Sequence, residues 1–348
     1  MIELSVVMIS RNQAWNMSRL IESVLRATSS ISSREVVLVD SASTDGTIEV
    51  AVQYPIGVLR LRQAQHPTPA AGRYIGYRHT TGKLILFLDG DMELVEGWLE
   101  RALQTFRGRS EVAVVTGLVV DLSKAAKAAD KPPLPADGST EVFEIPYTGG
   151  AAMYRRSVLE KTGTFNPYLY SDEEPELCIR VRHAGFRIAR LTYPIAFHYT
   201  DPRGGLSAQV ARWRRKLYLG AGQNLRYHLG KEIFWPYARE RGHGLVSVMV
   251  VLLILFSFLW TLVAGHTGAW ALVWGVLFGL LVAGDALRKR SLYQTLSSLL
   301  KQTLILDGTI RGFLSTPMDP RTYPDEFDLV KEVQALGNHA SQMTGGEL

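Results

Sequence analysis

The sequence predicts an α/β fold, a mostly parallel twisted sheet with flanking helices, followed by a C-terminal hairpin of two transmembrane helices. Short apolar runs alternate with amphipathic segments up to about residue 120, which is typical of βαβ units and a parallel sheet. Farther along the chain, two long stretches contain no charged residue. With 348 residues, the chain is long enough for two units, or for one large domain with an appendage.

Five apolar runs mark the expected strands of the N-terminal half. They lie at residues 4–9, 36–39, 58–61, 84–88 and 112–120. Apolar side chains at three- and four-residue spacing predict a helix between the first two runs, and capping residues at 43–47 open the next helix. Trp98, Ala102 and Phe106 form the apolar stripe of a helix after the fourth run.

The pattern becomes less regular after the fifth run. Residues 124–138 are rich in Ala, Lys and Pro, and we expect them to form a mobile loop. Helices are predicted at about 155–161 and 174–184, and short strands at 187–189 and 195–199.

Two carboxylates, Asp89 and Asp91, follow the fourth run with only Gly90 between them. Ligands of parallel sheets bind outside the carboxyl ends of the strands, so both acids are expected to face a crevice. Oxygen ligands with open positions favour a hard divalent cation, which usually accompanies phosphate chemistry. An ordinary Asp-Gly turn is the simpler alternative.

The first two strands also end in polar residues. Ser10 and Asn12 stand where a dinucleotide fold would have its glycine-rich turn. Asp40 ends the second strand and can accept hydrogen bonds from a base or a ribose, and Asp45 adds a further polar group. For Asp40, a turn or helix-capping acid is the alternative.

An acidic cluster, Asp172, Glu173, Glu174 and Glu176, lies at the start of a predicted helix. Neighbouring carboxylates raise one another's pKa, which suits a group that must take a proton near neutral pH. Acids also stabilise a helix N-terminus. That explanation accounts for one or two of these residues but not for four in five positions.

In their order along the chain, these motifs resemble those of the family 2 glycosyltransferases, inverting nucleotide-sugar enzymes of GT-A fold. Residues 37–47 look like the first acidic motif and Asp89-Gly90-Asp91 like the DxD motif, and the resemblance runs from about residue 4 to about 215. It implies Mg²⁺ or Mn²⁺ as cofactor, Asp40 at the base of the nucleotide, and Asp89 and Asp91 at the ribose and the metal.

Further positions are assigned by the same resemblance. Arg73 matches a position near the donor phosphates, with a solvent-facing helix arginine as the alternative. His198 matches a position that holds a third metal ligand in some GT-A enzymes, with a structural histidine as the alternative. Glu174 is the expected general base beside Glu173; because the family usually has Asp as its base, Asp172 stays open as an alternative.

Gln209, Arg212 and Trp213 resemble the QxxRW motif of processive members such as cellulose and hyaluronan synthases. In such a motif Trp could stack on an acceptor sugar and Arg could meet the diphosphate. A basic amphipathic helix at a membrane surface would use the same residue types.

The uncharged stretches predict membrane spans at about 245–265 and 267–284. Basic residues flank the pair on both outer sides, so both ends are expected in the cytoplasm. The N-terminus reads as a strand rather than a secretory signal, and a single cysteine, Cys178, rules out an intrachain disulfide. We therefore expect a multi-pass protein of the cell (inner) membrane with a cytoplasmic catalytic side.

The expected organisation has three parts. They are a GT-A domain at 1–230, a membrane region at 231–315 with an amphipathic helix at about 292–314, and a polar tail at 316–348. A net charge of +5 fits an anionic membrane surface or a phosphate-bearing substrate, and no nucleic-acid-binding motif is present in the sequence.

The function expected from the resemblance is metal-dependent transfer of a sugar from a nucleotide-diphosphate sugar donor, with UDP favoured. The acceptor would be a hydroxyl of a lipid-linked saccharide or a growing polysaccharide, with inversion, and membrane lipids would be partners. A polyprenyl-phosphate sugar synthase and a non-catalytic nucleotide-sugar-binding subunit of a membrane complex are the alternatives.

Overall fold

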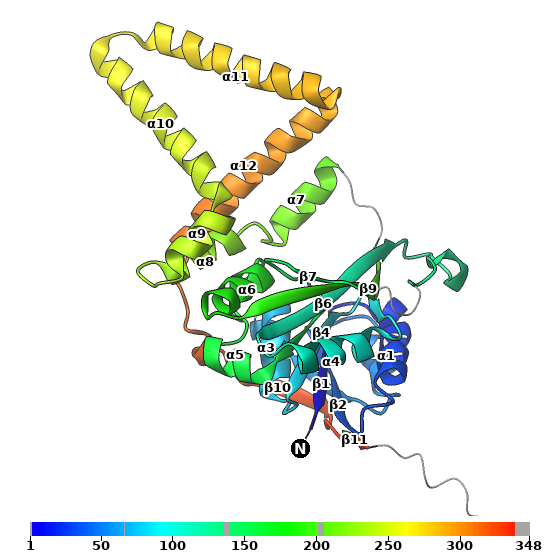
Figure 1. Cartoon of the computed structure of the whole chain (residues 1–348). Coiled ribbons are helices and arrows are strands. Elements are labelled where there is room, and N and C mark those ends of the chain that lie inside the picture. Colours follow the sequence, from blue (N-terminus) through cyan, green and yellow to red (C-terminus); the bar gives the residue numbers. More distant parts are fainter. Residues whose placement is uncertain (1, 66, 136–139, 201–204, 338–348) are drawn as a thin grey trace, which may run out of the picture. The chain divides into compact units, whose positions relative to one another are not determined.

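The computed structural model describes residues 2–65, 67–135, 140–200 and 205–337 (Figure 1). These residues form two compact units. One comprises Met1–Pro202 together with Met318–Leu348, and the other comprises Arg203–Pro317. Each unit is described separately below.

The first unit is built on one mixed sheet of eleven strands. Its order is β10-β3-β2-β1-β4-β8-β6-β9-β5, with β11 beside β2 and β7 beside β9. The strands are β1 (Leu4–Ser10), β2 (Ser33–Asp40), β3 (Gly57–Leu61), β4 (Leu84–Asp89), β5 (Met92–Leu94), β6 (Val112–Leu122), β7 (Val142–Glu144), β8 (Ala152–Arg155), β9 (Arg187–Tyr199), β10 (Phe327–Lys331) and β11 (Ala335–Gly337). The neighbours β3, β2, β1 and β4 are parallel, and β6 and β9 are parallel to each other. All five predicted strands are present.

Helices cover both faces of this sheet (Figure 1). They are α1 (Ala14–Ala27), α2 (Thr47–Ala51), α3 (Pro69–Arg78), α4 (Trp98–Gly108), α5 (Arg156–Thr162) and α6 (Glu173–His183). Side chains alternate across β1: Val6 and Met8 are buried in one cluster with α1 and α4, and Val7 and Ile9 in another with α3, α5 and α6. Burial on both faces explains why the strands are continuously apolar instead of alternating apolar and polar.

β9 differs from the prediction of two short strands, because it is continuous over its thirteen residues. Pro194 lies inside it, opposite Leu118 of β6, where the pairing between the two strands shifts register. Such a bulge is a position at which a strand tolerates proline. The strand therefore continues through the residues between the two predicted strands.

Of residues 124–138, predicted to form a mobile loop, those up to 135 are described. They contain a short 3-10 turn at Ala128–Asp130. Lys131 then forms an ion pair with Glu93 of β5 at 2.6 Å, and its ammonium lies over the ring of Phe197. This contact fixes part of the segment to the sheet, and residues 136–138 lie outside the described residues.

The segment expected as a polar tail instead returns to the sheet. β10 pairs antiparallel with β3, and β11 pairs antiparallel with β2. Ahead of them, Tyr323 is buried against Tyr74 and Tyr168. The remainder of the tail, residues 338–348, lies outside the described residues.

The second unit is helical. Its helices are α7 (Leu206–Arg214), α8 (Gly220–His228), α9 (Phe234–Arg241), α10 (His243–Ala264), α11 (Thr267–Lys289) and α12 (Leu292–Leu314). Two of them are long and apolar: Ser247–Ala264 has a mean hydropathy of 2.6 and Thr267–Lys289 of 1.8, and neither is buried within the protein. At 1.5 Å per residue, each covers roughly 30 Å, which matches a hydrocarbon layer.

Candidate active site

The carboxyl ends of three adjacent strands bring the predicted site together. Ser10 of β1 lies in register with Asp40 of β2, and Ile9 of β1 lies in register with Asp89 of β4. Residues from distant parts of the sequence therefore meet at one edge of the sheet, where parallel sheets bind their ligands.

Asp40 is fully buried at this edge. Its Oδ2 accepts a hydrogen bond from the backbone N–H of Ser43 at 2.8 Å. Its Oδ1 and the hydroxyl of Ser10 are both buried, and neither has a hydrogen-bond partner among the described residues. Burial raises the pKa of Asp40. Buried polar atoms normally find a partner, so these two atoms are suited to a polar ligand.

Asn12 and Asp45 bind neighbouring loops. Asn12 Oδ1 accepts the N–H of Thr44 at 2.8 Å, and the Asn12 N–H donates to Ser43 Oγ at 2.8 Å. Asp45 accepts the N–H of Ala14 at the start of α1 at 3.1 Å. Both side chains therefore hold the loops that follow β1 and β2 together, and their predicted contact with a donor stays a prediction.

Arg73 lies at the centre of the site and is almost completely buried. Thr68 caps α3 by accepting the N–H of Ala71, Pro69 begins the helix, and Arg73 follows one turn later with only 2% of its side chain exposed. The alternative of a solvent-facing arginine is therefore wrong. Its guanidinium contacts three carboxylates: Asp89 Oδ1 at 2.7 Å, Glu173 Oε1 at 2.9 Å and Glu174 Oε1 at 3.0 Å.

Burial and neighbouring negative charges raise the pKa values of two acids around Arg73. Burial raises the pKa of Asp89 to about 6, and Glu174 and Asp91 act in the same direction while Arg73 opposes them. Burial and the neighbouring Glu174 raise the pKa of Glu173 to about 8, again against Arg73. The two acids therefore retain protons at a higher pH than isolated carboxyl groups do.

The acidic cluster divides between this site and the scaffold. Asp172 is the N-cap of α6 and has a left-handed backbone, with φ at 65°. Only 6% of the Glu173 side chain is exposed, compared with 17% for Glu174. Of the two acids that contact Arg73 from α6, Glu174 is therefore the more accessible.

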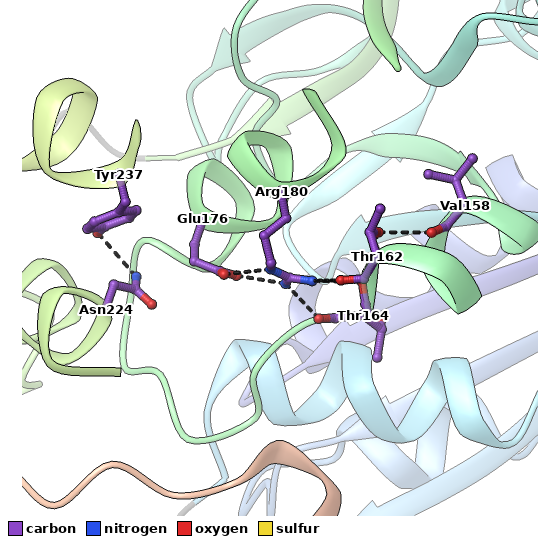
Figure 2. Close-up of polar contacts among 8 residues, drawn as sticks. Val158, Thr162, Thr164, Glu176, Arg180, Asn224 and Tyr237 are labelled. Atoms are coloured by element: carbon purple, nitrogen blue, oxygen red, sulfur yellow. Dashed lines mark hydrogen bonds and ion pairs between the residues drawn. The ribbon is translucent and has the colours of Figure 1, made fainter. Parts of the chain in front are cut away.

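Glu176 has a structural role, shown in Figure 2. Its two carboxylate oxygens accept hydrogen bonds from Arg180 at 2.6 and 2.7 Å, and Arg180 also donates to the carbonyl groups of Thr162 and Thr164. These contacts join α6 to the end of α5. The fourth acid of the cluster is thus explained without a catalytic function.

Two glycines allow the backbone to approach this edge. A Cβ at Gly150 would overlap Oδ2 of Asp89, whereas nothing lies within 4 Å of a Cβ at Gly149. A Cβ at Gly90 would lie 2.9 Å from Ser10 Oγ. Larger residues at positions 90 and 150 would therefore displace the side chains of the site.

Asp91 and His198 are neighbours because β5 and β9 pair antiparallel. His198 Nε2 lies 3.3 Å from Asp91 Oδ2, and its Nδ1 lies 2.7 Å from Asp121 Oδ1. The hydrogen bond to Asp91 raises the pKa of His198 to about 9, burial opposes the rise, and Asp121 adds to it. The sequence analysis missed Asp121, which the parallel register of β6 and β9 places opposite His198.

This arrangement fits a divalent metal in part. Asp121 can accept Nδ1–H of His198, which leaves Nε2 to bind a metal beside Asp91, an arrangement common in metal sites. Carboxylate ligands suit Mg²⁺ and Mn²⁺, and imidazole is a ligand of several transition metals. Among the described residues, no group of three His, Cys, Asp or Glu side chains forms a complete site. Water or phosphate oxygens would have to complete the coordination.

The QxxRW-like residues belong to the helical unit. Within it, Gln209 of α7 donates to Ser297 of α12 at 2.7 Å, and the indole N–H of Trp213 donates to Asp307 at 2.7 Å. Arg212 is exposed. Both contacts join α7 to α12, and the predicted binding of sugar or diphosphate by these residues stays a prediction.

The sequence is similar to those of known glycosyltransferases. Residues 5–163 match the family described as "Glycosyl transferase family 2". The chain is 26% identical over 226 residues to Glycosyltransferase AglE of Haloferax volcanii, covering 63% of this chain and 72% of that protein. It is 30% identical over 227 residues to the pre-mycofactocin glycosyltransferase of Mycobacterium tuberculosis, covering 60% of this chain but only 45% of the relative.

Among solved structures, the mannosyltransferase PcManGT from Pyrobaculum calidifontis, in complex with GDP-Man and Mn²⁺, is similar with a TM-score of 0.57 and 17% identity. The match covers 90% of this chain and 87% of that one. Similarity at this level shows a shared fold, and it confirms the predicted α/β class with its flanking helices.

Proposed function

We propose that this chain, which contains a glycosyltransferase domain of family 2, an inverting family, transfers a sugar from a nucleoside-diphosphate sugar to a hydroxyl of a lipid-linked saccharide or growing polysaccharide. The observation that carries the proposal is the convergence of Asp89, Glu173 and Glu174 on Arg73 at the sheet edge that also contains Asp40. Acids that would hold the donor are thereby linked to acids that would activate the acceptor.

Two buried oxygen atoms without a hydrogen-bond partner among the described residues support binding of the donor. Asp40 Oδ1 and Ser10 Oγ can accept hydrogen bonds from a nucleotide base or a ribose hydroxyl. Asp91 and His198 would hold Mg²⁺ or Mn²⁺ together with phosphate oxygens; Asp89, the third predicted ligand, pairs with Arg73 and does not form one metal-binding group with them among the described residues. The metal, when bound, neutralises the charge that develops on the leaving diphosphate. The mannosyltransferase of similar fold was solved with GDP-Man and Mn²⁺, a nucleoside-diphosphate sugar and a divalent cation of the kind proposed here.

Transfer itself needs one base. In a single displacement, the acceptor oxygen forms a bond to the anomeric carbon while the bond from that carbon to the diphosphate oxygen breaks, and the configuration inverts. The acceptor hydroxyl proton passes to Glu174, whose carboxylate is oriented by Arg73 at 3.0 Å and is more exposed than that of Glu173. Asp172 is the N-cap of α6, and the ion pairs that Arg73 forms with described residues are to Asp89, Glu173 and Glu174 instead.

Attachment to the cell membrane is the second part of the proposal. α10 and α11 are long and apolar enough to cross a bilayer, and their side chains are not buried within the protein. The basic residues Arg239 and Arg241 before them and Arg288, Lys289 and Arg290 after them favour a cytoplasmic position for both ends. An acceptor carried on a lipid would explain why the enzyme is membrane-bound.

The test is a panel of UDP- and GDP-sugars incubated with the purified full-length protein in detergent. We expect at least one donor to be hydrolysed slowly in the presence of Mn²⁺ or Mg²⁺, and EDTA to abolish the reaction. Asp91→Asn is the matched control and should lose the metal-dependent reaction. Binding of a donor without any turnover, by the native protein, would contradict the proposal and favour a non-catalytic subunit.

A further inference from the structure

Strands of the same sheet come before and after the helical unit in the chain. β1 to β9 precede α7 in the chain, whereas β10 and β11 follow α12. β10 is hydrogen-bonded to β3, and β11 to β2, over registers of three to four residue pairs each. A hydrogen-bonded sheet cannot be divided by a bilayer, because its edges would leave unpaired backbone groups in hydrocarbon.

This topology restricts how often the intervening chain crosses the membrane. Both links to the sheet must lie on the same side, so the number of crossings between them is even. Three helices of 22 or 23 residues lie between these links, namely α10, α11 and α12, and each is long enough to span. One of the three therefore does not cross if the other two do.

Composition identifies the helix that does not cross. Lys301, Asp307 and Arg311 are spread over α12 from its middle onwards. By contrast, α10 contains no Asp, Glu, Lys or Arg, and the charged residues of α11 lie together in its last two turns. Asp307 accepts the indole N–H of Trp213 at 2.7 Å and lies 3.4 Å from Arg311. Charged side chains at membrane depth cost several kcal/mol each unless a bundle interior holds them.

α12 packs against the apolar helices α10 and α11, but another of its neighbours, α8, is polar. A Cβ at Gly308 would overlap the carbonyl of Tyr218, and one at Gly312 would overlap the carbonyl of Leu219. α12 thus packs, backbone on backbone, against the start of α8, a helix whose sequence is GAGQNLRYH. Arg226 of α8 lies over the ring of Phe313. A helix fixed this closely to polar chain is unsuited to the hydrocarbon core.

We propose that α10 and α11 cross the membrane as a two-helix hairpin and that α12 lies along the membrane surface on the side of the sheet, with its N-terminal turns against the lipid headgroup region. This inference rests on the membrane attachment in the proposed function. Only Arg290 and Ser291 separate α11 from α12, so α12 begins where α11 leaves the bilayer. There, Leu292, Tyr293 and Leu296 are exposed apolar side chains that a lipid interface would cover.

The experiment is labelling of single cysteines with a membrane-impermeant maleimide in intact spheroplasts and in inverted vesicles. The native cysteine, Cys178, is completely buried, so the unmodified chain serves as the unlabelled control. Four exposed positions are each replaced by cysteine to show on which side of the membrane a segment lies. Glu49→Cys reports on the sheet unit and His266→Cys on the tip of the hairpin. Leu292→Cys reports on the start of α12 and Thr316→Cys on the segment after it.

We expect Glu49→Cys, Leu292→Cys and Thr316→Cys to label at least tenfold more in inverted vesicles, and His266→Cys to label at least tenfold more in spheroplasts. Labelling of Leu292→Cys and Thr316→Cys from opposite sides would show that α12 crosses, and would overturn this inference while leaving membrane attachment intact. Labelling of all four positions from one side, or recovery of the protein without membranes, would instead overturn the hairpin and the membrane part of the proposed function.

A depth measurement tests the surface position separately. Bimane attached at Leu296→Cys in reconstituted vesicles should be quenched more than twofold better by a headgroup nitroxide lipid than by a chain-centre nitroxide. Val250→Cys within α10 is the matched control and should show the opposite order. Equal or deeper quenching at residue 296 would contradict a surface location for α12.

Discussion

Arg73 Nη2 lies 2.7 Å from Asp89 Oδ1, while Nη1 of the same guanidinium lies 2.9 Å from Glu173 Oε1, one hundred residues farther along the chain. With Glu174 also at 3.0 Å, one buried cation faces three carboxylates. The residues proposed to bind the donor and those proposed to activate the acceptor therefore contact the same side chain.

Removing this cation should destabilise the protein. Arg73→Met leaves Asp89 and Glu173 without their partner in a largely buried site, and breaking such a pair costs about 3–5 kcal/mol. Thermal unfolding in detergent should show a clear loss in the melting temperature of the sheet unit. The double variant Arg73→Met/Glu173→Gln should recover part of it, because the buried site then contains one ionisable carboxyl group fewer; an unchanged melting temperature in Arg73→Met would contradict the inferred role.

A substitution at Gly150 tests whether activity depends on the position of the Asp89 carboxylate, and it changes no charged residue. Gly150→Ala adds a methyl group that overlaps Asp89 Oδ2, so the carboxylate or the backbone at residue 150 must shift. We expect the transfer rate to fall by about tenfold or more, since small misplacements of reacting groups can cost up to about a hundredfold. Gly149→Ala is the control, because its Cβ meets open space, and equal activity of the two variants would refute the proposed sensitivity.

Loss of the proposed base should reduce the chemical step. With a hydroxyl acceptor, Glu174→Gln should lower kcat by about 10²–10⁴-fold, the usual contribution of general base catalysis, while donor binding stays close to native. Glu173→Gln should affect kcat less because that carboxylate is less exposed. Full activity of Glu174→Gln with a polyprenyl phosphate acceptor, which is already an anion, would exclude this base and favour the polyprenyl-phosphate alternative.

The raised pKa of Glu173 predicts the direction of a pH dependence. Its folded pKa of about 8 exceeds the ordinary value of 4.5, so between these pH values the folded state holds a proton that the unfolded state has released. The contribution of Glu173 to the free energy of unfolding should therefore be highest at and below about pH 4.5. It should fall by at most about 1.4 kcal/mol per pH unit as the pH rises to 8. Asp89, with its pKa of about 6, contributes in the same direction at lower pH.

Glu173→Gln supplies the comparison for that measurement. Denaturant unfolding of the native chain and of this variant, followed from pH 5 to pH 8, should show a shallower decline in the variant, because Gln has no proton to release. Parallel curves would indicate that Glu173 does not titrate differently in the folded and unfolded states.

Much of the catalytic unit was predictable from local patterns. Apolar runs burying both faces marked the five strands from β1 to β4 and β6, and the acids at their ends placed Asp40, Asp89 and Asp91 at one edge of the sheet. These predictions succeeded because strand periodicity and turn residues act over a few neighbouring positions.

The strands that depend on distant partners were not predictable in the same way. β10 and β11 are only five and three residues long, too short to show a clear pattern of their own, and they pair with β3 and β2 at that part of the sheet. β9 runs past Pro194 because β6 shifts register opposite it. Pairing of this kind is decided by the partner strand, which a local pattern does not contain.

By itself, the sequence determined the α/β class, the acids at the strand ends and the two long apolar helices, since each follows from local spacing and composition. Only the tertiary structure decided that Arg73 is buried among Asp89, Glu173 and Glu174, that Asp121 supports His198, and that the chain returns to the sheet after α12. These are contacts between segments far apart in the chain, and they form where the packed sheet brings charges of opposite sign, or unpaired strand edges, to the same place.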